Sequence, residues 1–107
     1  MKIIQEHIDK LKILCGQYHV AELYVFGSIV SERYTNASDI DFLVKFSGVD
    51  PIEYFDNYMD FKASLETLFS REIDLVEIQS IRNPILKKSI DRNKIYLYGR
   101  EDAKVAV

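Results

Sequence analysis

The sequence predicts an α/β or α+β domain with a small β-sheet, because helical and extended patterns alternate along the chain. Apolar residues recur three or four positions apart in the segments 2–17, 52–70 and 84–92, which is typical of helices. Between and around them lie four short segments rich in β-branched and aromatic residues, which favour strands. A chain of 107 residues suffices for one hydrophobic core, so we expect a single domain over residues 1–107.

The composition is that of an ordinary globular protein, with 48% hydrophobic and 29% charged residues. A net charge of −3 provides no basic field, so we expect no direct binding to DNA. The single cysteine, Cys15, has no partner for an internal disulfide, which fits a cytoplasmic protein. The first residues lack the pattern of a signal peptide, and no apolar segment approaches the ~20 residues that span a membrane. We therefore expect a cytoplasmic protein without a membrane anchor.

Residues 2–17 form the first predicted helix. Ile4, Ile8, Leu11 and Cys15 recur at helical spacing and give one apolar stripe. Gly16, near the end of this pattern, is the predicted stop signal.

The segment 20–26 is the first predicted strand, and it leads directly into Gly27 and Ser28. Glycine allows backbone conformations closed to other residues and lets a ligand approach the main chain. Ser28 would cap a short helix over residues 29–34, whose positive end suits an anion such as phosphate. Taken alone, a Gly-Ser pair is more often an ordinary turn with a helix cap.

After a small polar loop, residues 39–46 form the second predicted strand. Its even positions, from Ile40 to Phe46, are all apolar and belong against helices. On the other face Asp39 and Asp41 stand side by side, because residues two apart in a strand share a face. Like charges this close repel each other, and a cation between them relieves the repulsion. The alternative is that both carboxylates are merely solvated at the start of the strand.

The longest predicted helix covers residues 52–70, with Asp50 as its N-cap and Pro51 at its first position. Its aromatic residues belong either to the core or to a partner surface, since a chain this short leaves part of them uncovered. They therefore predict a homodimer or a hetero-complex. The expected apolar face consists of Ile52, Phe55, Met59, Leu65, Leu68 and Phe69.

The third predicted strand, 72–78, carries Asp74 in an otherwise apolar centre. Aspartate has poor β-propensity, so a central aspartate indicates either a functional use or an edge position that faces water. If this strand lies beside the second one, Asp74 joins Asp39 and Asp41 as a third carboxylate.

The chain ends with a predicted helix and a predicted strand. Asn83 is a capping residue, and Pro84 suits the first helical position. The closing strand is expected at 94–98, while the tail 99–107 has no periodicity and is expected to fray. The helix runs to about residue 92, and its inward side chains are expected to be Ile85, Leu86 and Ile90.

Three carboxylates near a Gly-Ser turn point to one kind of chemistry. Carboxylate oxygens suit Mg²⁺, which prefers a few protein carboxylates together with substrate phosphates. A phosphate-binding turn beside such a site predicts a nucleoside triphosphate as substrate. Two Mg²⁺ ions would stabilise the attacking and leaving oxygens, and the third carboxylate would take the proton from an attacking hydroxyl.

Gly27-Ser28, ten intervening residues, Asp39-Ile40-Asp41 and a hydrophobic strand resemble the signature of the DNA polymerase β-type nucleotidyltransferase superfamily. The small size and the ending from Asn83 to Gly99 resemble its minimal nucleotidyltransferase subgroup, over residues 20–99. The resemblance implies a mixed sheet with helices mainly on one face. It also implies Mg²⁺-dependent transfer of a nucleoside monophosphate, with ATP as the expected donor.

The resemblance implies a role for each motif residue. Gly27 and Ser28 match the phosphate-contacting pair, and Asp39 and Asp41 match the metal ligands. Asp74 matches the third acidic position, so the three aspartates are the expected catalytic and metal-binding set. Several minimal members are antitoxins that attach AMP to a tyrosine of a HEPN-domain toxin, which makes a HEPN protein the expected partner.

One stretch departs from the family's pattern. Many members follow Gly-Ser with arginine, whereas this chain has Ile29-Val30-Ser31-Glu32, and its nearest cation is Arg33. A missing arginine removes a charge-assisted bond to phosphate worth roughly 1.5–3 kcal/mol, unless Arg33 reaches in from one turn later. Two hypotheses follow. The chain is either a Mg²⁺-dependent nucleotidyltransferase, expected to be an adenylyltransferase that acts on a protein tyrosine with Arg33 among its phosphate-binding residues, or a partner-neutralising subunit of a toxin–antitoxin pair with weak or absent catalysis.

Overall fold

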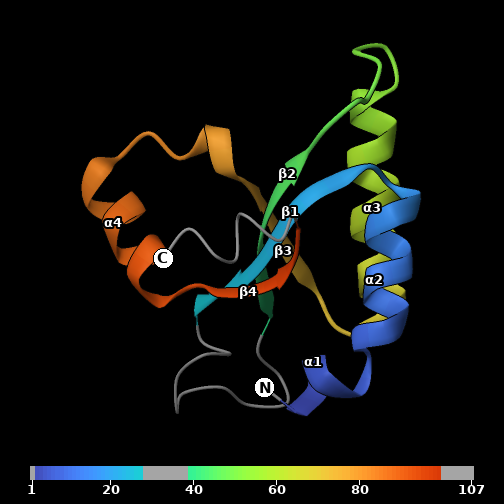
Figure 1. The fold of residues 1–107 in the computed structure, drawn as a ribbon, viewed down its shortest axis with the longest axis horizontal. Helices are drawn as coiled ribbons and strands as arrows, with labels where there is room; N and C mark the ends of the chain where they lie inside the picture. Colours follow the sequence, from blue (N-terminus) through green and yellow to red (C-terminus); the bar gives the residue numbers. More distant parts are fainter. Residues whose placement is uncertain (1, 28–38, 100–107) are drawn as a thin grey trace.

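Four strands form one mixed sheet with helices on both of its faces (Figure 1). The strand order is β3-β2-β1-β4. β1 (Val20–Phe26) is antiparallel to β2 (Ile40–Phe46) and to β4 (Ile95–Tyr98), whereas β2 is parallel to β3 (Ile73–Glu77). The predicted class, an α/β domain with a small mixed sheet, is confirmed.

The structure is a computed structural model that describes residues 2–27 and 39–99. The predicted helix over 29–34 lies outside the described residues, as do Ser28 and Arg33. In the described part of the chain, no helix combines the length and the apolar character needed to cross a membrane.

All four predicted strands are confirmed to within one residue at each end. β1 has its predicted bounds, and β2, β3 and β4 each begin one residue later than expected. Their alternating apolar residues explain the agreement, because a pattern of period two specifies both a strand and the face that it buries.

The main core lies between the sheet and the helices α1 (Lys2–Glu6), α2 (Ile8–Gln17) and α3 (Tyr54–Phe69). In Figure 1, α2 and α3 stand together on one side of the sheet. α3 also supplies the crossover that parallel strands require between β2 and β3. As predicted, the apolar face of β2 is buried there, through Ile40, Phe42, Val44 and Phe46.

The prediction of one continuous helix over residues 2–17 is wrong, because His7 divides it. The backbone of His7 has φ −116° and ψ 12°, which is not helical. Its Nδ1 lies 2.8 Å from the carbonyl oxygen of Ile3, and its ring packs edge-on against Phe69. Both contacts stabilise the break between α1 and α2. The apolar stripe still reaches the core, with Ile4, Leu11 and Cys15 buried.

Left-handed residues follow both long helices of this face. α2 continues to Gln17, one residue past the predicted stop at Gly16. His19, with φ 62°, turns the chain into β1 instead. Ser70, with φ 53°, ends α3 in the same way.

α3 begins at Tyr54 rather than at residue 52. Asp50 accepts a hydrogen bond from the amide of Ile52, with 2.9 Å between the nitrogen and Oδ1. Residues 51–53 form a turn, so this contact closes a turn ahead of the helix and does not cap the helix itself.

The predicted apolar face of α3 is half right. Leu65 and Phe69 are buried, together with Phe61. Ile52, Phe55 and Met59, however, are 90%, 70% and 42% exposed. The side of α3 that faces the core carries the partly buried Tyr54 and Tyr58 and the buried Phe61 and Leu65. Phe55 and Met59 each follow a tyrosine of this set by one position, which turns them by about 100° around the helix axis and away from the core.

α4 (Pro84–Asn93) lies on the opposite face of the sheet from α2 and α3 (Figure 1). Its predicted cap is confirmed, because Asn83 Oδ1 accepts hydrogen bonds from the amides of Ile85 and Leu86 at 2.9 and 3.3 Å. Ile90 is buried against Tyr24 and Leu43. The prediction that Ile85 and Leu86 also face inward is wrong, since they are 80% and 52% exposed. α4 buries only Ile90, in its C-terminal half.

Candidate active site

Asp41 is the second residue of β2, an inner strand of the sheet that is paired on both sides. Its partners in register are Phe26 on β1 and Asp74 on β3. Residues directly opposite each other on neighbouring strands project to the same face, so Asp41 and Asp74 share one side of the sheet. Asp39 is exposed and lies immediately before β2. The sheet therefore brings the three predicted aspartates into one region.

The carboxylates lie on the same face of the sheet as α4. Leu43, two residues beyond Asp41, belongs to the small cluster formed with Tyr24 and Ile90. Residues two apart in a strand share a face, so Asp41 projects to that side as well. The side chain of Asp41 is only half-buried, and that of Asp74 is exposed. This face leaves the carboxylates accessible to a ligand.

Gly27 ends β1 with a positive φ of 78°, a conformation that favours glycine. A Cβ added to this residue would overlap Asp41 Oδ2 and would lie 3.1 Å from Asp41 Cγ. The carboxylate of Asp41 therefore rests against the main chain at the start of the predicted phosphate-binding turn. Glycine is required here for both the backbone conformation and the space.

The Asp41 carboxylate has a raised pKa. Burial is the main cause, followed by the negative charges of Asp74 and of Asp39. A raised pKa means that the charged form is disfavoured, and a cation beside the carboxylate would reverse that effect. The charges of Asp74 and Asp39 thus act on the Asp41 carboxylate.

The three carboxylates fit Mg²⁺ in the chemistry of their donor atoms, because all of them supply hard oxygen ligands. Among residues 2–27 and 39–99, no group of three or more His, Cys, Asp or Glu side chains is already arranged as a metal site. Mg²⁺ commonly takes only one or two protein carboxylates and completes its shell with waters and substrate phosphates. Asp39, Asp41 and Asp74 are thus the residues that would hold the ion together with a nucleotide.

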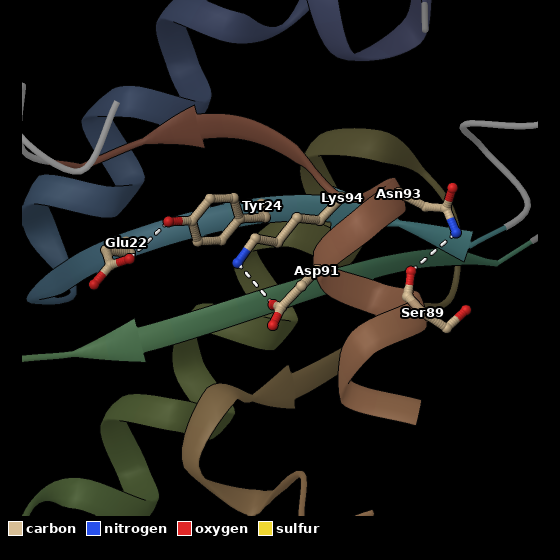
Figure 2. Close-up of polar contacts among 6 residues, drawn as sticks. All are labelled: Glu22, Tyr24, Ser89, Asp91, Asn93 and Lys94. Atoms are coloured by element: carbon tan, nitrogen blue, oxygen red, sulfur yellow. Dashed lines mark hydrogen bonds and ion pairs between the residues drawn. The ribbon is translucent and has the colours of Figure 1, made fainter. Parts of the chain in front are cut away.

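A polar network that the sequence reasoning missed lies beside this region (Figure 2). Lys94 Nζ stands 4.4 Å from the centre of the Tyr24 ring and 3.0 Å from Asp91 Oδ1. The Tyr24 hydroxyl donates to Glu22 at 2.7 Å. Burial, followed by this contact with Glu22, raises the pKa of Tyr24, so the phenol stays protonated. The network ties the end of α4 to β1, and the spacing of Asp91 and Lys94 was its one signal in the sequence.

Two of the predicted site residues are not described by the structure. Ser28 and Arg33 fall within 28–38, so their contact with phosphate stays a prediction. Ile29 and Ser31 also lie in this segment, so the effect of the missing arginine on phosphate binding stays a prediction too. Asp39, Asp41, Asp74 and Gly27 are placed, but their chemical roles also remain predictions.

Comparison with known sequences identifies relatives over nearly the whole chain. A family model described as "Polymerase beta, Nucleotidyltransferase" matches residues 9–103. The chain is 36% identical over 98 residues to a protein of Methanocaldococcus jannaschii named "Putative protein adenylyltransferase MJ1379". That match covers 90% of this chain and 92% of the relative.

Solved structures share the fold. One is described as "Structure of putative minimal nucleotidyltransferase", with a TM-score of 0.72 and 23% identity over 88% of this chain and 92% of that chain. Another is a "tri-AMPylated Shewanella oneidensis HEPN toxin in complex with MNT antitoxin", with a TM-score of 0.64 and 20% identity over 95% of this chain and 77% of that chain. At these identities the likeness shows the nucleotidyltransferase fold.

Proposed function

Because this chain belongs to the polymerase beta nucleotidyltransferase family, and is thus a nucleotidyltransferase, we propose that it transfers AMP from ATP to a protein hydroxyl. One observation carries the proposal: Asp41 is in register with Asp74 on the neighbouring strand and packs against Gly27 at the end of β1. A carboxylate pair next to a turn with a free main chain suits a nucleotide that carries a divalent cation.

The nucleotide binds, in this proposal, with its phosphates at the turn that begins at Gly27. The absence of a side chain at Gly27 gives the phosphates access to the main chain. Ser28 and Arg33 add a hydroxyl and a positive charge to the same site. Asp39, Asp41 and Asp74 hold two Mg²⁺ ions, which neutralise the phosphate charge and polarise the phosphorus–oxygen bonds when bound.

In the proposed transfer step, the acceptor oxygen attacks the α-phosphorus of ATP. The new oxygen–phosphorus bond forms as the bond between the α-phosphorus and the bridging oxygen breaks, and pyrophosphate leaves. The proton of the acceptor hydroxyl passes to Asp74, whose carboxylate is exposed. AMP is then esterified to the acceptor.

We propose a tyrosine of a HEPN-domain protein as the acceptor. The name of the M. jannaschii relative specifies a protein as substrate, which supports a protein acceptor. The antitoxin of similar fold is bound to a HEPN toxin that carries AMP, which supports this class of partner. Together these relatives favour an antitoxin role within a toxin–antitoxin pair.

The alternative is a subunit that neutralises its partner by binding alone. The residues Ile29 and Ser31 favour it, because they stand where arginine would bond to phosphate. A catalytic role and a binding role predict different outcomes in the same assay.

The assay incubates the protein with α-labelled ATP, Mg²⁺ and a HEPN-domain protein. We expect label on the partner, and we expect Asp41→Asn to reduce the transfer by about 10³-fold, as loss of a charged group at a reacting phosphate does. Lys45→Ala is the matched control, because Lys45 is an exposed β2 residue outside the site and is expected to leave transfer unchanged. Tight complex formation without transfer, and unaltered neutralisation by Asp41→Asn, would establish the binding role instead.

A further inference from the structure

The first half of α3 and the turn before it carry an apolar stripe that the fold leaves uncovered. Phe55 and Met59, four positions apart on α3, and Ile52 in the turn are all exposed. Beside them a groove of about 610 Å³ runs between α3 and the edge strand β3. Tyr54, Phe55 and Tyr58 form one wall of this groove, and Leu75, Val76 and Glu77 form part of the other. We call the stripe and the groove together the α3–β3 groove.

Side chains of α3 occupy part of the outer edge of β3. Among the described residues β3 pairs only with β2, so the backbone groups on its outer side have no strand partner there. Side chains of α3 engage two of them: the Tyr58 hydroxyl donates to the carbonyl of Leu75 at 2.5 Å, and Glu66 Oε2 accepts from the amide of Ile73 at 3.4 Å. These two contacts disfavour the addition of a strand at this edge, so we expect an occupant of the groove to bind mainly through side-chain contacts.

Acidic residues border the exposed stripe, and we call them its acidic rim. The segment 47–61 contains Asp50, Glu53, Asp56 and Asp60 and has no lysine or arginine, and Lys62 is the next residue. Glu77 adds a further carboxylate to the lining. In the part of the chain that the structure describes, Glu53, Asp56 and Asp60 form no ion pair. These charges are thus available to a partner.

This charge pattern selects among possible occupants. Phosphate backbones and anionic lipid surfaces are repelled by an acidic rim. A second copy that bound through the same face would oppose carboxylates to carboxylates, because a two-fold contact pairs a surface with itself. A protein surface with an apolar centre and flanking lysine or arginine residues is complementary in both respects.

The groove also lies next to the candidate active site. Leu75, which lines the groove, is adjacent in sequence to Asp74. Successive strand residues are about 3.3 Å apart and point to opposite faces, so only the width of the edge strand separates the groove from the Asp74 carboxylate. A protein seated in the groove can reach around this edge to the reacting atoms.

We infer that the α3–β3 groove is the docking site for the acceptor protein, and that the acceptor presents an apolar ridge flanked by basic residues. The acceptor role rests on the proposed function, whereas the docking chemistry stands on the groove itself. The inference separates two tasks: docking by α3 and β3, and transfer by Asp39, Asp41 and Asp74.

The test measures fluorescence anisotropy with two synthetic helical peptides that share one leucine and phenylalanine stripe. Lysines flank the stripe in the first peptide, and glutamates replace every lysine in the second. The full chain is tested in three forms: the native protein, the double variant Phe55→Ser/Met59→Ser and the double variant Asp56→Lys/Asp60→Lys. Ile13→Ser is the matched control, because Ile13 is 68% exposed on α2 and lies outside this groove.

We expect the native protein to prefer the lysine peptide by about ten-fold or more, which a few charge pairs at a rim can provide. The Phe55/Met59 variant is expected to lose about ten-fold in affinity, and the Asp56/Asp60 variant to reverse the preference. The control is expected to bind as the native protein does. Equal binding of both peptides, or an equal loss in the control, overturns the inference. Sedimentation that reveals self-association abolished in the Phe55/Met59 variant also overturns it, because a second copy would then be the occupant.

Binding of Mg²⁺-ATP, measured by calorimetry, separates this inference from the proposed function. The Phe55/Met59 variant is expected to bind Mg²⁺-ATP as the native protein does, since α3 packs on the face of the sheet opposite to the one that carries the Asp41 and Asp74 side chains. A native protein that prefers the lysine peptide but does not bind Mg²⁺-ATP contradicts the proposed function and supports the docking site. A protein that binds Mg²⁺-ATP but has no peptide preference overturns the docking site alone.

Discussion

The two faces of the sheet differ in how they are covered. On one face, α1, α2 and α3 bury a continuous apolar core that includes Phe42, Phe61 and Leu65. On the other face, the buried cluster that the described residues form consists of Tyr24, Leu43 and Ile90, and α4 is the helix that covers it among those residues. The thinly covered face is the one that carries Asp41 and Asp74. A small domain can leave polar residues accessible on one face because the opposite face supplies most of the burial that stabilises it.

The largest expected effect comes from truncation in the main core. Phe61 is fully buried and packs near Phe46 and Tyr18, with ring centres 5.9 and 5.8 Å apart. Phe61→Ala is expected to lower the free energy of unfolding by about 3–5 kcal/mol, because it removes a large side chain and leaves a cavity. Ile90→Ala, on the other face, is expected to cost about 2 kcal/mol, the low end for such a truncation. Urea unfolding measures both, and equal losses would mean that the two faces contribute alike.

An intermediate effect is expected at the junction of β1 with the candidate site. Gly27→Ala should lower the free energy of unfolding by about 2 kcal/mol, because alanine is strained at positive φ and its Cβ would displace the Asp41 carboxylate. Gly16→Ala is the control. Gly16 lies in α2 with open space around its Cα, so alanine there is expected to stabilise the protein by about 0.5 kcal/mol. Unfolding in urea distinguishes the two variants, and a Gly27→Ala protein of native stability would show that neither strain nor overlap operates.

The smallest expected effect is the loss of folding stability at high pH, and it differs between Cys15 on one face of the sheet and Tyr24 on the other. Burial raises the pKa of the Cys15 thiol to about 12 from its usual value of 9.0. The unfolded chain therefore releases this proton first as pH rises, so the folded state loses stability above pH 9. Between pH 8 and pH 10 the loss from Cys15 is about 1.4 kcal/mol. Tyr24, on the other face, has its pKa raised as well, but its unfolded form titrates about one pH unit higher, so its effect up to pH 10 is smaller.

The measurement compares urea unfolding at pH 8 and pH 10 for the native protein, Cys15→Ala and Tyr24→Phe. Cys15→Ala is expected to lose about 1.4 kcal/mol less than the native protein across this interval. Tyr24→Phe should lose about 0.4 kcal/mol less. If the free energy of unfolding falls by the same amount from pH 8 to pH 10 in the native protein and in Cys15→Ala, the thiol does not remain protonated in the folded state.

Much of the sheet could be predicted from the sequence, because each strand contains its own alternating pattern. The sequence could not predict that Asp41 lies opposite Asp74, because this requires β2 and β3 to be neighbours. No residue in either strand specifies which strands become neighbours in the sheet. The buried faces and the ends of the helices were harder to predict from the sequence. Both stripes of α3, the one through Phe61 and the one through Phe55, are apolar, and only the packed fold decides which of them is buried. The break at His7 depends on a contact with Phe69, which is distant in sequence.

The hydrogen bond from Tyr58 to Leu75 has a consequence for the accuracy of folding. A slip of β3 by one residue along β2 would send every side chain of β3 to the opposite face. Leu75 would then stand opposite Asp41, and Asp74 would be driven into the apolar core. The contacts of α3 with the backbone of Ile73 and Leu75 hold β3 at one position along its neighbour. α3 thus sets the register of β3, so that Asp74 projects to the face of the sheet that carries Asp41.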